Sequence, residues 1–474
     1  MPTRRSATLA SLMVVLLAFA LLAGVSPATA TDSPRVWAVS PAAGPEAGGE
    51  RVTLRGRGFT RHTRVYFGKT RGTFVRVLSP RRLRVTTPAH APGSVRVRVA
   101  SSLGWSPLRS APTYTFEATA TSAFSRITAG DSVSAWPAIS GDGSKIAFGS
   151  SSSNLAGDLD PIYWDIFVYD TANQAIRRLT RGGTADYDPP SISRDGRYVT
   201  FGTNAVLVPE DVNGLWDVYV VDTTTGEITR CTAGNGDSSD AAISADGHFV
   251  VFESSASDLL PGDANDGLSV YRYSLADGSI ERIAADASDP ATSGDGRFTA
   301  FTSRAAGEPY TVAVFDAQNA STVHLPGGNL SSEAPAISEN SGVVAYYATS
   351  DTGFGPPETS LMFFDLLTLS SFAPLPGVSP EYYPVSLSAD GTRAIFASSD
   401  ISGVPGDTTE TTDVFVLDPA ARDLRRVTAG TGGGFAPSVT ADGHSIVFVS
   451  GDQTLAPGGL DGMADIFRYD EPLN

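Results

Sequence analysis

The sequence contains very few residues with reactive or metal-binding side chains. Among 474 residues there is one cysteine, Cys231, and there are five histidines, no two of them within four residues of each other. A single cysteine excludes an internal disulfide framework and a cysteine-based zinc cluster, and scattered histidines argue against a histidine-rich metal site. Charged residues make up only 18% of the chain and hydrophobic residues 41%, a balance typical of a folded protein rather than a disordered one.

Long apolar runs are also scarce, and the one that exists lies near the start. Arg4 and Arg5 precede the run Leu12–Leu22, and a small-residue cleavage site ends at Ala30. This order is typical of a signal peptide, here residues 1–30, and the run is too short for a comfortable membrane span. The arginine pair leaves the twin-arginine export route open. We therefore expect cleavage near Ala30 and secretion to the extracellular space or cell envelope, with no membrane span.

Charge is distributed very unevenly along the chain. Residues 31–117 contain 15 basic and 4 acidic side chains, a balance of +11, whereas the residues after Glu117 contain 17 basic and 47 acidic ones, a balance of −30. Such a split indicates two regions with different surroundings. The basic region could contact an anionic polymer, or the two regions could attract and solvate each other.

Short alternating strands are predicted throughout residues 31–118. In Ser94–Val99, for example, three valines alternate with Arg96 and Arg98, which places the apolar side chains on one face and the cations on the other. About seven such strands in so short a module, separated by turn residues, predict a β-sandwich.

The same module resembles the immunoglobulin-like IPT/TIG family. The resemblance rests on several motifs in the expected order, namely Val39–Pro45, Ala47–Gly49, Leu54–Phe59, Val65–Gly68 and Thr87–Gly93. It implies a binding or spacer domain without catalytic activity. Some relatives contact DNA, but secretion removes nucleic acid as a partner here, so an anionic cell-wall glycan is the partner that the basic strands would suit.

From residue 119 to residue 474 the chain repeats one pattern: a short polar strand, an Asp-Gly turn and an apolar strand. The turn glycines of seven copies, counting Gly342 in a degenerate fifth copy, lie 53, 51, 49, 46, 49 and 52 residues apart. A period near 50 fits four-stranded propeller blades better than a helical solenoid. Asp-Gly between two alternating strands predicts a hairpin, because glycine tolerates the positive φ of the turn.

The two ends of the repeat region complement each other. A third and a fourth strand follow most copies, such as Asp165–Asp170 and Ile176–Thr180, but the seventh copy stops after its third strand. A fourth-strand pattern stands alone before the first copy, at Phe124–Gly130. We therefore predict an all-β protein in which these termini pair and close a seven-bladed β-propeller, which leaves no long sheet edge exposed.

The copies resemble the TolB-like family of propeller repeats, whose pattern is Pro, Ser and an Asp-Gly turn before an apolar strand. TolB-like propellers are typically six-bladed, so six blades are the alternative. The resemblance implies binding of a protein or ligand more often than catalysis. In agreement, the chain has no G-x-S-x-G nucleophile motif and no sialidase box. The turn aspartates are expected to cap their own turns.

Loops before the third strands contain acidic and amide side chains of the kind that bind Ca²⁺. Their arrangement partly resembles the calcium loops of integrin-type propellers, with fewer oxygen donors per loop. The predicted weak calcium ligands are Asp158, Asp160, Asp165, Asp211, Asn213, Asp217, Asp263, Asn265, Asp407, Asp413, Asp461 and Asp465. The alternative is that these side chains only bond loop amides and solvate the rim.

A second candidate site is the mouth of the propeller's central channel. The residues just before each first strand would surround it, and four acids and three aromatics there could hold a cationic peptide segment or a sugar. The predicted ligand-binding residues are Trp136, Asp188, Asp240, Asp289, Glu333, Tyr383 and Phe435.

These observations favour a secreted, non-enzymatic binding or scaffold protein, expected to be a monomer. It would recognise an extracytoplasmic protein or a cell-wall glycan through the propeller and the basic IPT/TIG domain, with no cofactor beyond weakly bound Ca²⁺. The alternative is a secreted glycan-active enzyme whose carboxylates lie at the channel mouth, because a carboxylate pair is the usual machinery of glycoside cleavage.

Overall fold

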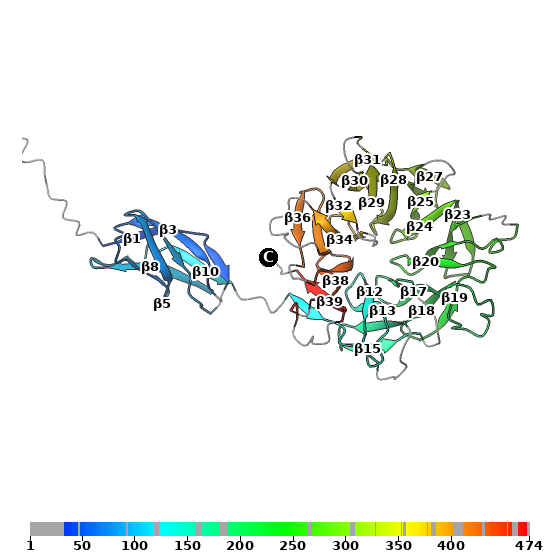
Figure 1. Cartoon of the computed structure of the whole chain (residues 1–474), viewed down its shortest axis with the longest axis horizontal. Coiled ribbons are helices and arrows are strands. Elements are labelled where there is room, and N and C mark those ends of the chain that lie inside the picture. Colours follow the sequence, from blue (N-terminus) through cyan, green and yellow to red (C-terminus); the bar gives the residue numbers. More distant parts are fainter. Residues whose placement is uncertain are drawn as a thin grey trace, which may run out of the picture. The chain divides into compact units, whose positions relative to one another are not determined.

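The computed structural model divides the chain into two compact units, with the boundary between Thr121 and Ser122 (Figure 1). Within the described residues the chain forms strands and turns but no helix, and so no helix that could cross a membrane. The structure describes residues 33–45, 48–91, 93–117, 123–156, 164–180, 188–262, 267–303, 309–327, 329–351, 353, 357–376, 378–380, 385–401, 411–428, 432–452, 454–456 and 463–471.

The first unit is a sandwich of two sheets. One sheet has the order β1 (Arg35–Ser40), β3 (Arg51–Arg57), β7 (Arg82–Thr86) and β6 (Thr73–Ser79). The other has the order β2 (Ala43–Pro45), β10 (Thr113–Glu117), β8 (Gly93–Ser101), β4 (Arg64–Phe67) and β5 (Thr70–Arg71), and β9 (Gly104–Trp105) pairs with β8.

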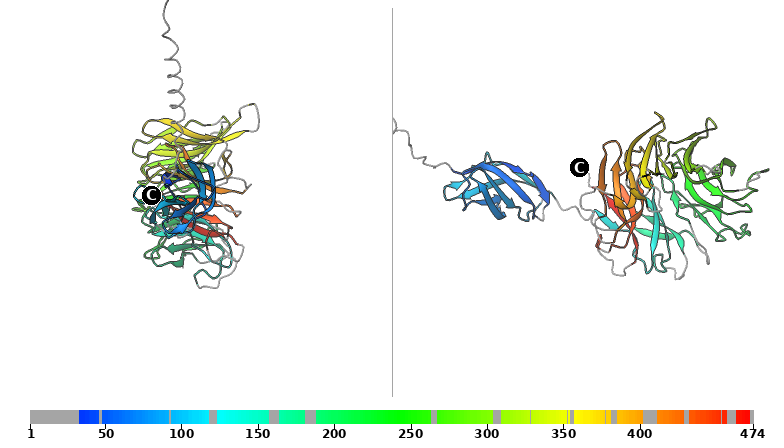
Figure 2. Two further views of the ribbon diagram at one scale, coloured as in Figure 1. Left: turned by 90° about the vertical axis from the view of Figure 1, so that its left-hand side faces the viewer. Right: turned by 45° about the horizontal axis from the view of Figure 1, so that its top comes forward.

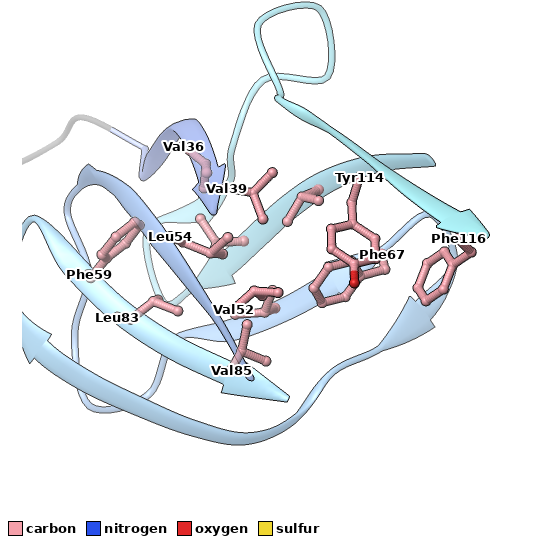
Figure 3. Close-up of a cluster of buried hydrophobic side chains, with 13 residues drawn as sticks. Val36, Val39, Val52, Leu54, Phe59, Phe67, Leu83, Val85, Tyr114 and Phe116 are labelled. Carbon is pink, nitrogen blue, oxygen red and sulfur yellow. The ribbon is translucent and has the colours of Figure 1, made fainter. Parts of the chain in front are cut away.

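Strict alternation along these strands produces the core between the sheets. Val52 and Leu54 of β3 are fully buried, and Arg51 and Arg55 on the same strand are exposed. Figure 3 shows the buried side chains converging, with Tyr114 against Phe67. The Tyr114 hydroxyl donates a hydrogen bond of 2.6 Å to Glu50, which satisfies the polar end of a buried side chain.

The second unit contains seven antiparallel sheets in its described residues, arranged around a centre, with first strands such as β20 and β24 innermost in their sheets (Figure 1). One sheet therefore corresponds to each predicted repeat. Sheet 1 is β12 (Ser134–Ile139), β13 (Lys145–Ser150), β14 (Asp165–Asp170) and β15 (Ala175–Arg178); sheet 2 is β16 (Ser191–Ile192), β17 (Tyr198–Thr203), β18 (Asp217–Asp222) and β19 (Ile228–Arg230); sheet 3 is β20 (Ser238–Ile243), β21 (Phe249–Ser254), β22 (Ser269–Ser274) and β23 (Ile280–Ala285); sheet 4 is β24 (Ala287–Thr292), β25 (Phe298–Ser303), β26 (Thr311–Asp316) and β27 (Ser321–His324).

The remaining three sheets continue the same order around the ring. Sheet 5 is β28 (Ser331–Ile337), β29 (Val343–Ser350), β30 (Glu358–Asp365) and β31 (Ser370–Pro376); sheet 6 is β32 (Val378–Pro380) and β33 (Ser386–Leu387), both on β34 (Ala394–Ile401), then β35 (Asp413–Asp418) and β36 (Asp423–Arg426); sheet 7 is β37 (Phe435–Val439), β38 (Ser445–Ser450), β39 (Asp465–Asp470) and β11 (Phe124–Arg126).

The Asp-Gly turns have the predicted local role. Ser140 donates a hydrogen bond of 2.7 Å to Asp142, and the same carboxylate accepts the backbone N–H of Ser144 at 2.8 Å. Gly143 follows with φ of 71°. In the degenerate fifth copy the left-handed residue is Ser341, with φ of 61°, and not Gly342. The assignment of Gly342 as the turn glycine was therefore wrong by one residue.

These turns are bonded to one another in a closed series around the ring. Each turn donates a backbone N–H to a carbonyl of the next turn, at distances of 2.9 to 3.0 Å. We call the residues that begin the turns the turn belt: Gly141, Arg194, Ala245, Gly294, Glu339, Ala389 and Ala441. The seventh turn bonds back to the first, from Ala441 N–H to the carbonyl of Gly141.

Side chains of the turn belt meet at the centre of this end of the ring. A Cβ atom on Gly141 would lie 2.8 Å from Arg194 Cγ and 3.3 Å from Ala441 Cβ, so only glycine fits there without displacing them. Arg194 Nε donates to Glu339 Oε2 at 2.7 Å, which joins sheet 2 to sheet 5. Of the seven belt side chains, these are the two charged ones, and each neutralises the other.

The predicted pairing of the two ends of the repeat region is present. β11 pairs with β39 in an antiparallel register, with Phe124 opposite Tyr469. Figure 2 shows the cyan start of the second unit beside its red last strand. Ile127 N–H donates to the Ile466 carbonyl at 2.8 Å. Arg126 forms an ion pair with Asp465, and both side chains are almost fully buried. The first described strand of the unit thus completes the sheet that contains the last one.

We expect the Arg126–Asp465 pair to be essential for this closure. Asp465→Ala leaves a buried guanidinium without its counter-ion and should lower the free energy of unfolding by about 3–5 kcal/mol. Asp423→Ala is the control, because its carboxylate is exposed and ion-paired at the surface, where such a pair is worth less than about 1 kcal/mol. Urea titrations followed by circular dichroism compare the two, and equal stability would contradict this role.

Candidate functional site

Four of the predicted calcium ligands begin third strands, and each is bonded within its own sheet. Thr180 donates to Asp165 at 2.8 Å, Thr232 to Asp217 at 2.8 Å and Thr428 to Asp413 at 2.5 Å. In sheet 7 Thr128 donates to Asp465 at 2.8 Å. An arginine of the fourth strand also pairs with each carboxylate, and the four arginines are Arg178, Arg230, Arg426 and Arg126.

This repeated Asp–Arg–Thr arrangement holds the outermost strand to the rest of the sheet. A cation at these carboxylates would have to displace a buried guanidinium, whose positive charge already occupies the place of a metal ion. Asp211 is similarly engaged, since it accepts a hydrogen bond of 2.6 Å from Tyr219. Asn213 bonds the Gly234 carbonyl at 3.2 Å.

The other predicted calcium ligands cannot be placed in this way. Calcium binding at the loops therefore stays a prediction. The residues concerned lie outside the described part of the chain: Asp158, Asp160, Asp263, Asn265, Asp407 and Asp461.

The predicted channel-mouth residues lie at a bulge in the innermost strands. Trp136, Asp240 and Asp289 have φ of 53°, 50° and 52°, and the strand register shifts at each of them. Ala334 and Ala436 have the same backbone conformation in sheets 5 and 7. A left-handed conformation is costly for residues with a Cβ, and its recurrence in five sheets makes the bulge a property of the repeat.

The predicted channel-mouth residues occupy two different positions along the inner strands. Trp136, Asp240 and Asp289 are themselves the left-handed residues of the bulge, and the other described ones precede that position by one residue. Glu333 and Phe435 precede the left-handed alanines by one residue, and Asp188 occupies the same preceding position in sheet 2, where its N–H donates to the Gly202 carbonyl. Tyr383 lies outside the described residues.

The structure brings three of the predicted acids together with a fourth that sequence reasoning missed. Carboxylate oxygens of Asp240, Glu253 and Asp289 lie within 4.8 Å of one another. Asp188 joins them through Oδ2, which accepts the N–H of Asp240 at 3.0 Å. We call Asp188, Asp240, Glu253 and Asp289 the acidic cluster. Its members come from sheets 2, 3 and 4.

Two carboxylates of the cluster also support the strained backbone of the neighbouring sheet. Asp188 of sheet 2 accepts the amide of Asp240 in sheet 3, and Glu253 of sheet 3 accepts the amide of Asp289 in sheet 4 at 3.2 Å. Gly202 leaves room for the Asp188 carboxylate, because a Cβ at position 202 would lie 2.4 Å from Asp188 Oδ2.

Crowding changes the acidity of this cluster. Burial, with a contribution from the charge of Asp240, raises the pKa of Glu253 to about 7. Burial and the same neighbouring charge raise the pKa of Asp188 to about 6. The pKa of Asp240 is raised as well, by partial desolvation and by Asp289. Near neutral pH the cluster is therefore poised between charge states, and a nearby cation would favour full ionisation.

Aromatic residues occupy the adjoining part of the ring. The rings of Trp136 and Trp164 lie 4.7 Å apart, and Phe435 packs in the same apolar cluster with Ala135 and Val449. We call Trp136, Trp164 and Phe435 the aromatic cluster, which belongs to sheets 7 and 1. Gly149 makes room for it, since a Cβ there would approach Trp136 Cε3 to 3.0 Å.

Comparison of the repeats explains how Glu253 could have been found. Strand pairing places Gly149, Glu253 and Val449 at equivalent positions, each opposite the residue that precedes the bulge. Glu253 is the acid among these positions, inside an otherwise apolar strand, Phe249–Ser254. An acid within a mainly apolar strand is a recognisable signal of a functional or strained site.

The arrangement suits a ligand that presents a positive charge beside an apolar or planar group. The carboxylates offer hydrogen-bond acceptors and negative charge, and the tryptophans offer a ring face for a cation or an apolar surface. Asp240, Glu253 and Asp289 are also the described residues whose oxygens could surround a metal ion.

We expect the acidic cluster to make stability decrease as pH rises. The pKa of Glu253 is about 7 in the folded protein, above the ordinary value of 4.5, so the folded state holds more protons between these values. Glu253→Gln should therefore gain about 2 kcal/mol over the wild type between pH 5 and pH 8. Urea titrations across this range measure it. The expectation would be contradicted if the difference in free energy of unfolding between Glu253→Gln and the wild type did not change with pH. It would also be contradicted if Glu227→Gln, a variant at an exposed position, gained stability relative to the wild type in the same way.

Comparisons with known proteins found one family model and several solved structures. The IPT/TIG domain model matches residues 34–114. TolB from Acinetobacter baumannii is 22% identical over 57% of this chain and 57% of its own, with a TM-score of 0.35. The β-propeller domain of the Trilobed protease from Pyrococcus furiosus is 11% identical over 72% of this chain and 95% of its own, with a TM-score of 0.49.

The chain thus spans little more than half the length of TolB, the protein that the repeats were predicted to resemble. A search of curated proteins finds no match. Residues 34–114 are an IPT/TIG domain, and the seven sheets that follow have the architecture of a β-propeller.

Proposed function

We propose that this protein is a secreted, non-enzymatic binding protein that recognises an extracytoplasmic protein at the centre of its propeller. The observation that carries the proposal is the chemistry beside the bulges of the inner strands, where sheets 2 to 4 carry the acidic cluster and sheets 7 and 1 carry the aromatic cluster. The basic IPT/TIG domain would add a contact to a cell-wall glycan. Secretion follows from the predicted signal peptide in residues 1–30.

The chemistry of the acidic and aromatic clusters favours a lysine or arginine of the partner protein as their ligand. A cation between Asp240 and Asp289 would offset the mutual repulsion of these carboxylates and lower their pKa values. The long apolar stem of lysine or arginine would pack on Trp136, as such stems do on aromatic rings. A neutral sugar could pack on the aromatic rings, but it would leave the carboxylates of the acidic cluster without a counter-ion.

A glycan-active enzyme is the second candidate, and one observation favours it. Glu253 and Asp188 have raised pKa values close to neutral and lie beside other carboxylates. An acid that keeps its proton near pH 7 next to an ionised partner is the arrangement used in glycoside hydrolysis.

We expect the cluster to bind cationic peptides with a dependence on charge. The probe is a set of hexapeptides with one central lysine, each matched by a norleucine peptide, titrated into the full chain by calorimetry. Asp240→Asn with Asp289→Asn should weaken lysine-peptide binding about ten- to hundredfold, since hydrogen bonds to charged groups contribute about 1.5–3 kcal/mol. Affinity should also rise from pH 5 to pH 8 as the cluster ionises.

The matched control is the double variant Glu210→Gln with Glu227→Gln, which removes two negative charges from exposed positions of sheet 2. It should bind like the wild type. Equal binding of the lysine and norleucine peptides would overturn the proposal. Release of reducing sugar from wall glycan, abolished by Glu253→Gln, would instead establish the enzyme.

A further inference from the structure

A concave, basic site lies in the IPT/TIG domain. A cavity of about 480 Å³ is present at the turn belt, but a larger one of about 810 Å³ is lined by residues 61–64 and 71–75. Its walls are the loop before β4, the start of β4 and the connection from β5 to β6. Arg61, Arg64, Arg71 and His62 line it, and no acidic residue does.

The sheet register explains why two of these arginines share one face. Arg71 lies opposite Tyr66 in the β4–β5 hairpin, and Arg64 precedes Tyr66 by two residues on the same strand. Residues two apart on a strand point to the same face, so Arg64 and Arg71 are diagonal neighbours about 7–8 Å apart. Such proximity of like charges is unfavourable in the absence of an anion.

Unlike the arginines of the Asp–Arg–Thr arrangement, the cavity arginines have no acidic partner among the described residues. Within the described residues no ion pair involves Arg61, Arg64 or Arg71, and Arg61 Nε donates to His62 Nε2 at 3.0 Å. Arginines on the outer strands of the propeller, such as Arg178 and Arg230, are buried against aspartates. The cavity arginines are exposed and available to an anionic ligand.

A strained aromatic residue stands at the rim of the same cavity. Phe74 is 87% exposed and has φ of 47°, at a register shift in β6. The chain reaches it through Gly72, where a Cβ would lie 2.6 Å from Val85 Cγ2. A bulky side chain with positive φ, and no burial to compensate, is the kind of strain that collects at ligand contacts.

Aromatic rings and cations continue from the cavity across the sheet. Tyr66 lies opposite Arg98 on β8, and its ring packs at a tilt against Trp105 with ring centroids 4.8 Å apart. The Arg98 guanidinium lies 4.8 Å from the centroid of Trp105, which is 48% exposed. Tyr66, Arg98 and Trp105 therefore place ring faces beside a positive charge on the sheet that also carries Arg64 and Arg71.

We propose that this surface, centred on the cavity of Arg61, Arg64, Arg71 and Phe74, binds a polymer of carboxylate-bearing sugars. The guanidinium groups would pair with carboxylates in bidentate geometry, and the aromatic faces would cover the apolar faces of sugar rings. The inference deepens the proposed binding function, on which it rests for a setting outside the cytoplasm. It assigns the glycan contact of the IPT/TIG domain to named residues.

The test measures binding of polygalacturonate to the full chain, with dextran, polyphosphate and duplex DNA as comparison probes. The double variant Arg64→Ala with Arg71→Ala should lose at least tenfold in affinity. Its control, Arg82→Ala with Arg84→Ala, removes the same charge from the exposed face of the other sheet and should change affinity less than twofold. Equal losses would mean that binding follows net charge alone, and would overturn the site.

Phe74→Gly separates contact from folding. Glycine removes the ring and the backbone strain, so this variant should have a raised Tm but at least fivefold weaker binding to polygalacturonate. Unchanged affinity would overturn the role of Phe74. Tighter binding of DNA or polyphosphate than of polygalacturonate would overturn the ligand class. The variant Asp240→Asn with Asp289→Asn should bind polygalacturonate normally, so failure of the propeller proposal remains distinguishable.

Discussion

Each innermost strand of the propeller ends in a tight turn whose backbone amides must be bonded near the axis of the ring. The turn belt meets this requirement with a series of hydrogen bonds in which every sheet donates to the next, back to the first. Sheets joined in this way cannot tilt independently, and the bulges at the other end of the same strands are held in equivalent positions. The positions of the acidic and aromatic clusters therefore depend on the hydrogen bonds of the turn belt.

The belt also limits which side chains can occupy the axis. Five of its seven members are glycine or alanine, and the two larger ones, Arg194 and Glu339, neutralise each other across the centre. Near the bulges the side chains differ between sheets, with acids on sheets 2 to 4 and aromatics on sheets 7 and 1. Equivalent strand positions thus present a different chemistry around the ring.

Local patterns predicted the fold better than the site. The Ser-x-Asp-Gly turns and the displaced strand at Phe124 were recognisable because their partners lie either within a few residues or in an equivalent copy. The degenerate turn was displaced by one residue, because Ser341 adopts the positive φ that glycine usually supplies. Glu253 and Trp164 were missed, since what they contact depends on bulges and on neighbouring sheets rather than on sequence spacing. The third-strand aspartates that were predicted to bind calcium form ion pairs with fourth-strand arginines. Both strands were identified from the sequence, but the pattern did not show which side chains of the two strands lie opposite each other.

The pairing of β11 with β39 has a consequence for the time at which the fold is completed. Arg126 bonds a carboxylate 339 residues further along the chain, so β11 has no partner until almost all of the chain has been synthesised. The strand pairs of the IPT/TIG domain, in contrast, lie within one short module and can form early. Contacts between such distant segments form slowly, and during this interval sheet 7 presents an open edge that other chains can join. Ribosomal pausing or truncation before β39 would therefore leave six complete sheets, the β37–β38 pair and an unpaired β11, a species prone to aggregation.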